Sequence, residues 1–345
     1  MTLDPAFDGQ PANIFVLKNR QGMRVTLMDI GATWLSCEIP VGDEMRDVIL
    51  GVTTMADHLS QKAYLGATIG RFANRISEGK FAIEGRHYQV DTNQGNNTLH
   101  GGAIGFDKCR WHSQQLNNNE LTFTLLSKDG DQGFPGNLQV KVTYRLSEDN
   151  KLSIDYWAVT DKACPVNLTN HAYFNLMGET EQSCLQHQLF IAAEQYAPVN
   201  DMGFPIGHIK GVAGSSFDFR ALKEVGQEFL SCQEQKIVAG YDHPFLINKT
   251  HQDGKKVAAK CISADKKVTL EIATTQPALQ FYTGNHLAGT PNRFGGEYTN
   301  LSGLALETQS LPDAPNHPEW EQPSSILLPG EVYAQQTSYH FITDD

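Results

Sequence analysis

Apolar and polar residues alternate along several short stretches of this chain. The alternation is clearest at residues 23–29, 140–146 and 268–273, and similar patterns occur at 121–126 and 152–159. A period of two places successive side chains on opposite faces of a β-strand. These stretches are therefore predicted to be half-buried strands.

Turn-forming residues separate the predicted strands at short intervals. Clusters of Gly, Asp, Asn and Pro occupy residues 129–137, 148–150, 253–255 and 295–296. Many short strands joined by frequent turns are typical of an all-β sandwich or barrel. We expect this class of fold.

Helical patterns are sparse by comparison. Short helices are predicted over residues 54–59 and 221–230, and the longer helices that alternate with strands in a parallel sheet are missing. No internal repeat or linker is visible, and the Pro-rich stretch 311–318 reads as an irregular loop. We therefore expect one domain over residues 1–345.

Composition and charge narrow the class of protein. Apolar residues make up 40% of the 345 positions and charged residues 19%, which is ordinary for a globular protein. The net charge of −12 would repel a phosphate backbone, so nucleic acid is not an expected partner. No apolar run reaches the roughly 18 residues of a membrane span, and residues 1–10 lack the pattern of a signal peptide. We expect a cytoplasmic protein without a membrane partner.

Six cysteines are scattered along the chain without paired spacing. They are read as small buried apolar residues or free thiols.

Candidate chemistry is concentrated in five polar segments, each beside Gly, Pro, Asn or an aromatic residue. They are residues 70–75, 97–102, 170–175, 241–244 and 306–308. Their side chains include two imidazoles, two carboxylates and a guanidinium that could act together. Such a set suits proton transfer on a neutral, hydroxyl-rich molecule, because protons are delivered and removed while hydrogen bonds hold the substrate.

Glu307 and His171 have alternative interpretations when each is taken alone. Glu307 ends an apolar run, where a structural salt bridge or an exposed strand end is the simpler explanation of a single carboxylate. Its ordinary pKa of about 4.3 would leave it ionised as a base. His171 lies in a segment whose alternation places five polar side chains on one side, facing either water or a cleft. An adjacent carboxylate would favour the charged form of its imidazole.

The residues of the other polar segments also have structural interpretations. His100 precedes two glycines and is compatible with a turn-capping histidine, and Asp242 is compatible with an Asx turn before a proline. Arg71 and Arg75 each fit a surface ion pair.

Metal and nucleotide sites find little support. None of the twelve histidines shows H-x-x-x-H or H-E-x-x-H spacing, and no cysteine pair accompanies them. The nucleophile motif G-x-S-x-G and a Gly-rich phosphate loop are also missing. We expect no metal and no cofactor.

These segments together resemble the aldose 1-epimerase, or galactose mutarotase, family almost from end to end. The resemblance is carried by residues 69–76, 99–108 with Trp111, 130–138, 167–176, 240–244, 279–284 and 304–320. It implies a large antiparallel β-sandwich whose cleft binds a free hexose such as galactose or glucose. It also implies interconversion of the α and β anomers by acid/base ring opening and closure without a cofactor.

The resemblance assigns roles residue by residue. Glu307 matches the general base of the family and His171 its general acid. The catalytic group also includes His100, which positions the sugar and supports charge together with Arg75 and Asp242. Further substrate contacts are implied for Asn74, Tyr173 and Gln280, whereas Arg71 becomes structural. A monomer or weak homodimer is expected.

Three rival functions remain at this stage. A hexose 6-phosphate substrate would require several cationic donors around the phosphate. A silent sugar-binding module would not need both Glu307 and His171. A glycosidase would use two carboxylates at the scissile bond.

Overall fold

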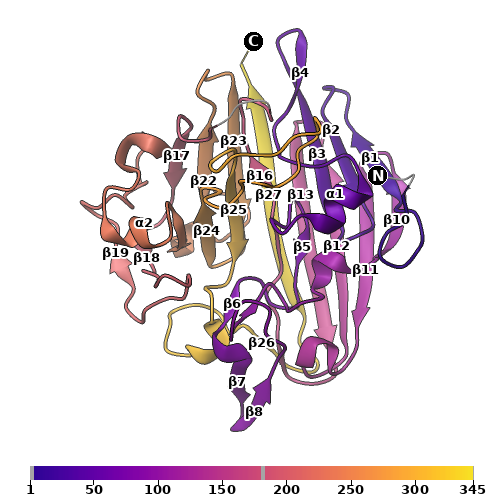
Figure 1. Cartoon of the computed structure of the whole chain (residues 1–345), viewed down its shortest axis with the longest axis vertical. Coiled ribbons are helices and arrows are strands. Elements are labelled where there is room, and N and C mark those ends of the chain that lie inside the picture. Colours follow the sequence, from indigo (N-terminus) through magenta and orange to yellow (C-terminus); the bar gives the residue numbers. More distant parts are fainter. Residues whose placement is uncertain (1–3, 180–182, 345) are drawn as a thin grey trace.

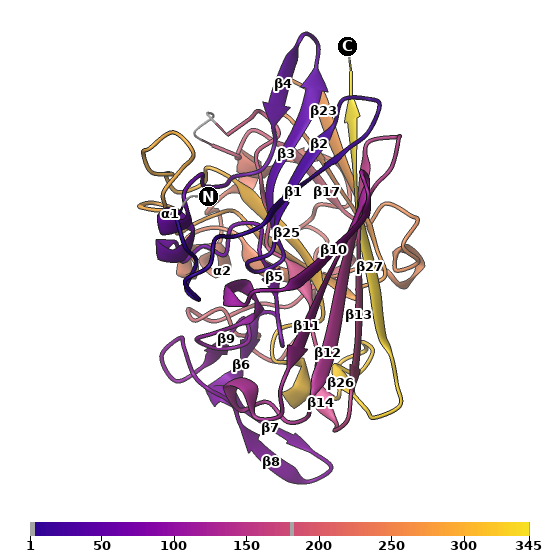
Figure 2. The same cartoon turned by 90° about the vertical axis from the view of Figure 1, so that its right-hand side faces the viewer.

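The structure is a computed structural model that describes residues 4–179 and 183–344. A nine-stranded sheet forms one layer, and a six-stranded and a four-stranded sheet lie against it (Figures 1 and 2). The hydrophobic cluster with the most residues reaches along the chain from Leu17 to Phe341, and smaller clusters accompany it. The expected all-β sandwich with few short helices is confirmed.

The nine-stranded sheet is antiparallel throughout. Its strands, in spatial order, are β10 (His112–Asn117), β11 (Glu120–Ser127), β12 (Leu138–Leu146), β13 (Lys151–Thr160), β27 (Tyr333–Thr343), β23 (Val268–Thr274), β22 (Ala259–Ile262), β17 (Gln188–Ile191) and β20 (Lys223–Glu224). Four of the five stretches predicted from alternation lie here, in β11, β12, β13 and β23. Every second residue of β13 is buried, as a period of two requires.

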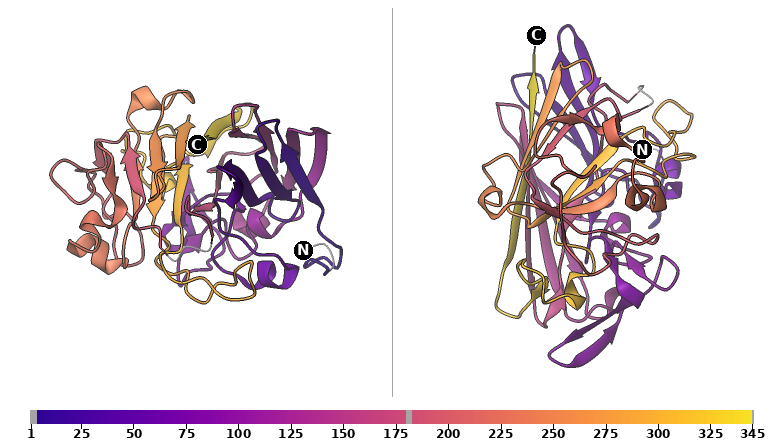
Figure 3. Two further views of the ribbon diagram at one scale, coloured as in Figure 1. Left: turned by 90° about the horizontal axis from the view of Figure 1, so that it is seen from above. Right: turned by 90° about the vertical axis from the view of Figure 1, so that its left-hand side faces the viewer.

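The last strand of the chain lies in the middle of this sheet. β27 pairs with β13 on one side and β23 on the other (yellow in Figures 1 and 3). It thereby joins a strand from the first half of the chain to one from the second half.

The second layer contains two further antiparallel sheets. The six-stranded sheet has the order β16 (Tyr173–Phe174), β25 (Leu304–Gln309), β24 (Ala278–Tyr282), β21 (Asp242–Leu246), β18 (Gln195–Tyr196) and β19 (Lys210–Gly211). The four-stranded sheet has the order β1 (Ile14–Lys18), β2 (Arg24–Met28), β3 (Thr33–Val41) and β4 (Glu44–Asp47). The predicted strand at residues 23–29 is β2.

Four short strand pairs connect the sheets and carry several polar segments. They are β5 (Thr68–Ile69) with β15 (Thr169–Asn170), β6 (Arg75–Ile76) with β9 (Thr98–Leu99), β7 (Lys80–Ile83) with β8 (Arg86–Gln89), and β14 (Cys164–Pro165) with β26 (Ile326–Leu327).

The helices are short. The helix α1 (Met55–Ser60) begins where predicted, because the Thr54 side chain accepts a hydrogen bond from the Asp57 N–H. The helix expected over 221–230 is wrong: β20 and a 3₁₀ turn (Val225–Glu228) lie there, and α2 (Gln233–Ile237) follows. The Val225 and Gly226 N–H groups donate to carbonyls of His187 and Leu185, so tertiary hydrogen bonds replace helical ones.

The remaining helical turns are of the 3₁₀ type. They are Ser77–Gly79, Phe106–Lys108, Asp131–Gly133, Lys249–His251 and Ala314–Asn316. No helix in the described ranges combines the length and the apolar character that crossing a membrane requires.

Candidate active site

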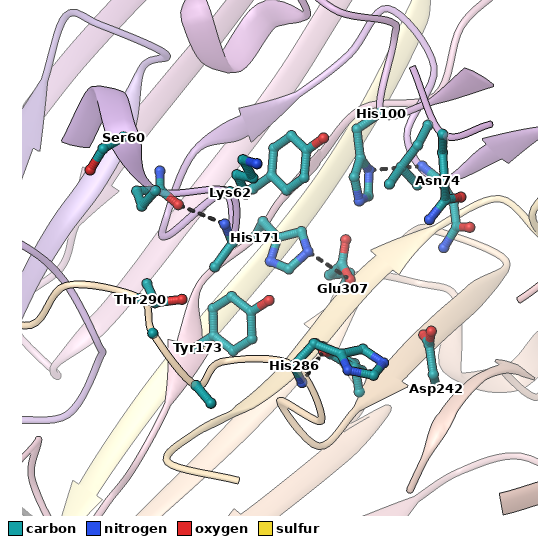
Figure 4. Close-up of a pocket in the computed structure, with 18 of the residues that line it drawn as sticks. Ser60, Lys62, Asn74, His100, His171, Tyr173, Asp242, His286, Thr290 and Glu307 are labelled. Atoms are coloured by element: carbon teal, nitrogen blue, oxygen red, sulfur yellow. Dashed lines mark hydrogen bonds and ion pairs between the residues drawn. The ribbon is translucent and has the colours of Figure 1, made fainter. Parts of the chain in front are cut away.

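A cavity of about 600 Å³ lies where the six-stranded sheet meets the short strand pairs (Figure 4). Tyr173, Glu307 and Asp242 reach it from strands β16, β25 and β21 of that sheet. The other side is formed by the β6 and β9 pair and by loops around residues 60–64 and 286–291. Seven of the eight predicted site residues line this cavity: Asn74, Arg75, His100, His171, Tyr173, Asp242 and Glu307.

Glu307 lies within β25 rather than at its end, with two further strand residues after it. Its side chain is almost fully buried, and its Oε2 atom has no hydrogen-bond partner among the residues that the structure describes. Burial raises the pKa of Glu307 to about 8, with a further contribution from Asp242, while Arg75 lowers it. The expectation of an ordinary carboxyl pKa is therefore wrong, because the ionised carboxylate would be buried without water to solvate its charge.

His171 occupies the link between β15 and β16 and faces Glu307. Its Nε2 atom lies 3.6 Å from Oε1 of Glu307 (dashed in Figure 4). Burial lowers the pKa of His171 to about 4, and Asp242 partly opposes this shift. The expectation that a nearby carboxylate favours a charged imidazole is not met, because desolvation of His171 outweighs the attraction.

His100 follows β9 and contacts the same cavity. Its backbone has a positive φ of 53°, and its Nδ1 atom accepts a hydrogen bond of 3.1 Å from the Asn74 N–H. A neutral imidazole that accepts at Nδ1 carries its proton on Nε2. Burial, then His171 and Arg75, hold the pKa of His100 well below its ordinary value. His100 is therefore a neutral N–H donor.

Arg75 is held by several polar partners. Its Nε donates to Gln94 Oε1 at 3.0 Å, its Nη1 to Asn74 Oδ1 at 3.3 Å, and its Nη2 lies 3.8 Å from Asp242 Oδ2. Gln280 is the predicted contact that does not line the cavity. It is buried in β24 opposite Glu307 and donates from Nε2 to Asp242 Oδ1 at 2.6 Å.

Arg71, by contrast, points away from the cavity into the protein interior. Its guanidinium donates to the carbonyls of Ser127, Lys128, Pro135 and Gly136 and to the Ser127 hydroxyl. It ties the loop after β11 to the β5 region. Its structural role is clear, although hydrogen bonds to carbonyls replace the surface ion pair considered from the sequence.

The polar segment around His171 is buried on both sides. His171 and Tyr173 line the cavity, whereas Asn167 and Asn175 bond to backbone groups of Ala73, Ser310 and Ser302. The alternation of the sequence therefore does not show which of these polar residues face the cavity. The reason is that β15 and β16 are each only two residues long, too short to keep a period of two.

Several residues outside the predicted set also line the cavity. They are Ser60, Gln61, Lys62, Ala63, Tyr64, Gln94, Leu99, Tyr282, His286, Ala288, Gly289, Thr290 and Pro291. Most lie in irregular segments, where no periodicity or motif marks a side chain as facing a cavity.

Three residues of the cavity bring possible metal ligands close together. Ligand atoms of His100, His171 and Glu307 lie within 4.8 Å of one another, and all three residues are buried. Coordination needs an imidazole lone pair, but the His100 lone pair on Nδ1 already accepts the Asn74 N–H. This set fits proton transfer better than metal binding.

Comparison with known proteins identifies the family of this chain. A family model described as aldose 1-epimerase matches residues 13–340. The chain belongs to this family. It is 51% identical over 338 residues to the aldose 1-epimerase of Escherichia coli K12, covering 98% of this chain and 97% of that protein. It is 42% identical over 329 residues to the galactose mutarotase of Rattus norvegicus, covering 95% and 93%.

Solved structures of the family share the fold. An aldose epimerase homologue from C. elegans superposes with a TM-score of 0.89 at 29% identity, covering 97% of this chain and all of that one. A galactose 1-epimerase from Lactobacillus acidophilus gives 0.86 at 29% identity, covering 98% and 96%.

Proposed function

We propose that this aldose 1-epimerase family member interconverts the α and β anomers of free hexoses such as galactose and glucose. The observation that carries the proposal is the pair formed by Glu307 and His171, which face each other at 3.6 Å inside the cavity. At this separation the two groups can contact two oxygens bonded to the same carbon atom. The relatives named aldose 1-epimerase and galactose mutarotase support the same reaction.

Ring opening needs one proton removed and one supplied. Glu307 takes the proton from the O1 hydroxyl, and the O1–C1 bond becomes a carbonyl. The C1–O5 bond breaks, and its electron pair goes to O5, which takes a proton from His171. Rotation about C1–C2 exposes the other carbonyl face, and the two residues reverse roles on closure. A positioned acid and base each contribute about 10² to 10⁴-fold.

The pair must hold one proton between its two members. Desolvation favours the neutral form, with the proton on Glu307 and the pKa values displaced to about 8 and about 4. The proposed reaction starts from the other form, with the proton on His171. Both forms contain the same number of protons, so pH does not change their ratio, and the pair titrates as a unit.

The remaining polar residues would hold the sugar. His100 offers an N–H donor, and Arg75, Asp242, Asn74 and Tyr173 offer further groups for hydroxyl recognition. We propose that Gln280 acts mainly through Asp242, because its amide is already bonded there.

A neutral hexose fits better than its 6-phosphate. Asn74, Gln94 and Asp242 already engage the Arg75 guanidinium. Lys62 is the other fixed cation of the cavity lining, and it is exposed. Turnover of glucose and glucose 6-phosphate should be compared directly, and a preference for the phosphate would overturn this choice.

We further propose that the protein works without a cofactor, in the cytoplasm, as a monomer or weak dimer. Its six cysteines are free thiols, which fits a reducing compartment.

Polarimetry of freshly dissolved α-galactose and α-glucose tests the function. The protein should accelerate the change in optical rotation, and Glu307→Gln and His171→Asn should each lower kcat by at least about 10²-fold with the fold intact. Circular dichroism serves as the folding control. Near-normal rates in either variant would reject its assigned role, and sugar binding without acceleration by the parent would favour a silent binding module.

A further inference from the structure

The turn that carries Tyr64 is bonded directly to the backbone of His171. Gly66 N–H donates to the His171 carbonyl at 3.0 Å, and His171 N–H donates to the Ala67 carbonyl at 2.9 Å. The Ala67 N–H closes the turn on the Tyr64 carbonyl at 3.0 Å. The position of residue 64 relative to residue 171 is therefore fixed by the backbone.

The Tyr64 ring packs on both cavity histidines. It stacks on His171 with a centroid distance of 5.8 Å and an interplanar angle of 27°, and it meets His100 edge-on at 4.6 Å. Tyr173 packs against the same His171 ring at 4.9 Å. Two tyrosine rings thus restrict the rotation of the imidazole that faces Glu307.

The backbone at Tyr64 is held in an unfavourable conformation. Its φ of 57° lies in the left-handed region, where non-glycine residues are uncommon and strained. The Tyr64 hydroxyl has no hydrogen-bond partner among the described residues, so the ring accounts for the contacts of this side chain with the histidines.

We propose that Tyr64 is a positioning residue whose ring holds the His171 imidazole toward Glu307 and keeps water away from it. This inference rests on the proposed function, since it assigns the reason why His171 can serve as a proton donor in that reaction. The ring, and not the hydroxyl, carries the effect.

Loss of the ring changes both geometry and titration. Misplacing a catalytic group by about 1 Å can cost about 10²-fold in rate. Water admitted beside His171 would also raise the pKa of this imidazole from about 4 toward its ordinary value. Titratable groups that face His171 from the surrounding elements are Glu307, Asp242, His100, Tyr64 and Tyr173.

The test compares three variants of the full chain. Tyr64→Gly removes the ring and tolerates the positive φ, whereas Tyr64→Phe keeps the ring. Tyr282→Ala is the matched control, because it deletes an aromatic of the same cavity whose ring contacts Tyr173 rather than His171. The readouts are kcat and KM across pH, and NMR titration of the His171 ring, assigned with His171→Asn.

Tyr64→Gly should lower kcat at least about tenfold. It should also shift the acid limb of the pH profile of kcat to higher pH by at least about one pH unit. Tyr64→Phe should keep the parent values of kcat and of the acid limb, and Tyr282→Ala should leave the acid limb at the parent pH. An unchanged limb in Tyr64→Gly would overturn the inference. Equal losses of kcat in Tyr64→Phe and Tyr64→Gly would assign the effect to the hydroxyl, and this result would also overturn the inference. The NMR titration reports on His171 even if the parent does not catalyse mutarotation, so failure of the proposed function remains distinguishable.

Discussion

At the scale of single residues, burial decides the chemistry of the site. The sequence indicated which residues matter, because the segments around His171 and Glu307 resemble those of a known family. It did not indicate their protonation, because an isolated Glu or His has an ordinary pKa and desolvation appears only when sheets close around it. The same limit explains why Tyr64 was missed: only the folded turn brings its ring onto His171.

Glu307 should make stability depend on pH. In the unfolded chain its carboxyl ionises near pH 4.5, but in the folded protein its pKa is about 8. Between these values the unfolded chain binds fewer protons, so this residue reduces the free energy of unfolding as pH rises. Glu307→Gln removes the free-energy cost of keeping this carboxyl protonated above pH 4.5. It should therefore stabilise the protein progressively from pH 5 to pH 8, by at most about 5 kcal/mol.

Urea unfolding of parent and Glu307→Gln at pH 5 and pH 8 measures this difference. The pH 5 pair is the internal control, where little of the penalty has developed. A difference that is constant between the two pH values would contradict the raised pKa.

At the scale of elements, alternation located the long strands well. All five stretches with a period of two lie in strands β2, β11, β12, β13 and β23. Prediction failed where segments are short or tertiary contacts prevail. The two-residue strands that flank His171 carry too little pattern, and at residues 221–230 the hydrogen bonds to residues 185–187 override helical propensity.

A side chain at Gly66 should destabilise the protein. A Cβ there would lie 1.9 Å from the Trp34 carbonyl oxygen, and its φ is 66°. Gly85 is a matched control, because its φ is 79° but no atom lies within 4 Å of its added Cβ. Gly85→Ala should cost about 1 to 2 kcal/mol of stability from backbone strain alone.

Gly66→Ala should cost roughly 1 to 3 kcal/mol more than Gly85→Ala, because the backbone must move to remove the overlap. Urea unfolding compares the two. Equal losses in the two variants would show that Gly66 is needed only for its φ and that its close contact has no energetic consequence.

At the scale of the whole molecule, the site depends on segments that are distant in the chain. Glu307 comes from β25, His171 from the link between β15 and β16, and His100 from the turn after β9. Strand patterns alone did not predict that these three side chains lie close together. The family resemblance did, because it carries the relation between segments that local periodicity lacks.

We propose that residues 1–345 form one domain. One hydrophobic cluster includes residues from Leu17 to Phe341, and β27 joins strands from both halves of the chain in the large sheet. Unfolding by urea should therefore follow one transition, with coincident curves from tryptophan fluorescence and far-UV circular dichroism. Two separated transitions would mean that parts of the chain fold independently.

The central claim is that Glu307 and His171 share one proton and work as an acid/base pair. The most direct measurement is the pH dependence of kcat/KM for mutarotation of α-galactose, after subtraction of the rate without protein. The pair predicts activity between about pH 4, where His171 of the free protein gains a second proton, and about pH 8, where Glu307 loses the shared one. Activity that continues unchanged well above pH 8, or that lacks an acid limb near pH 4, would contradict the account.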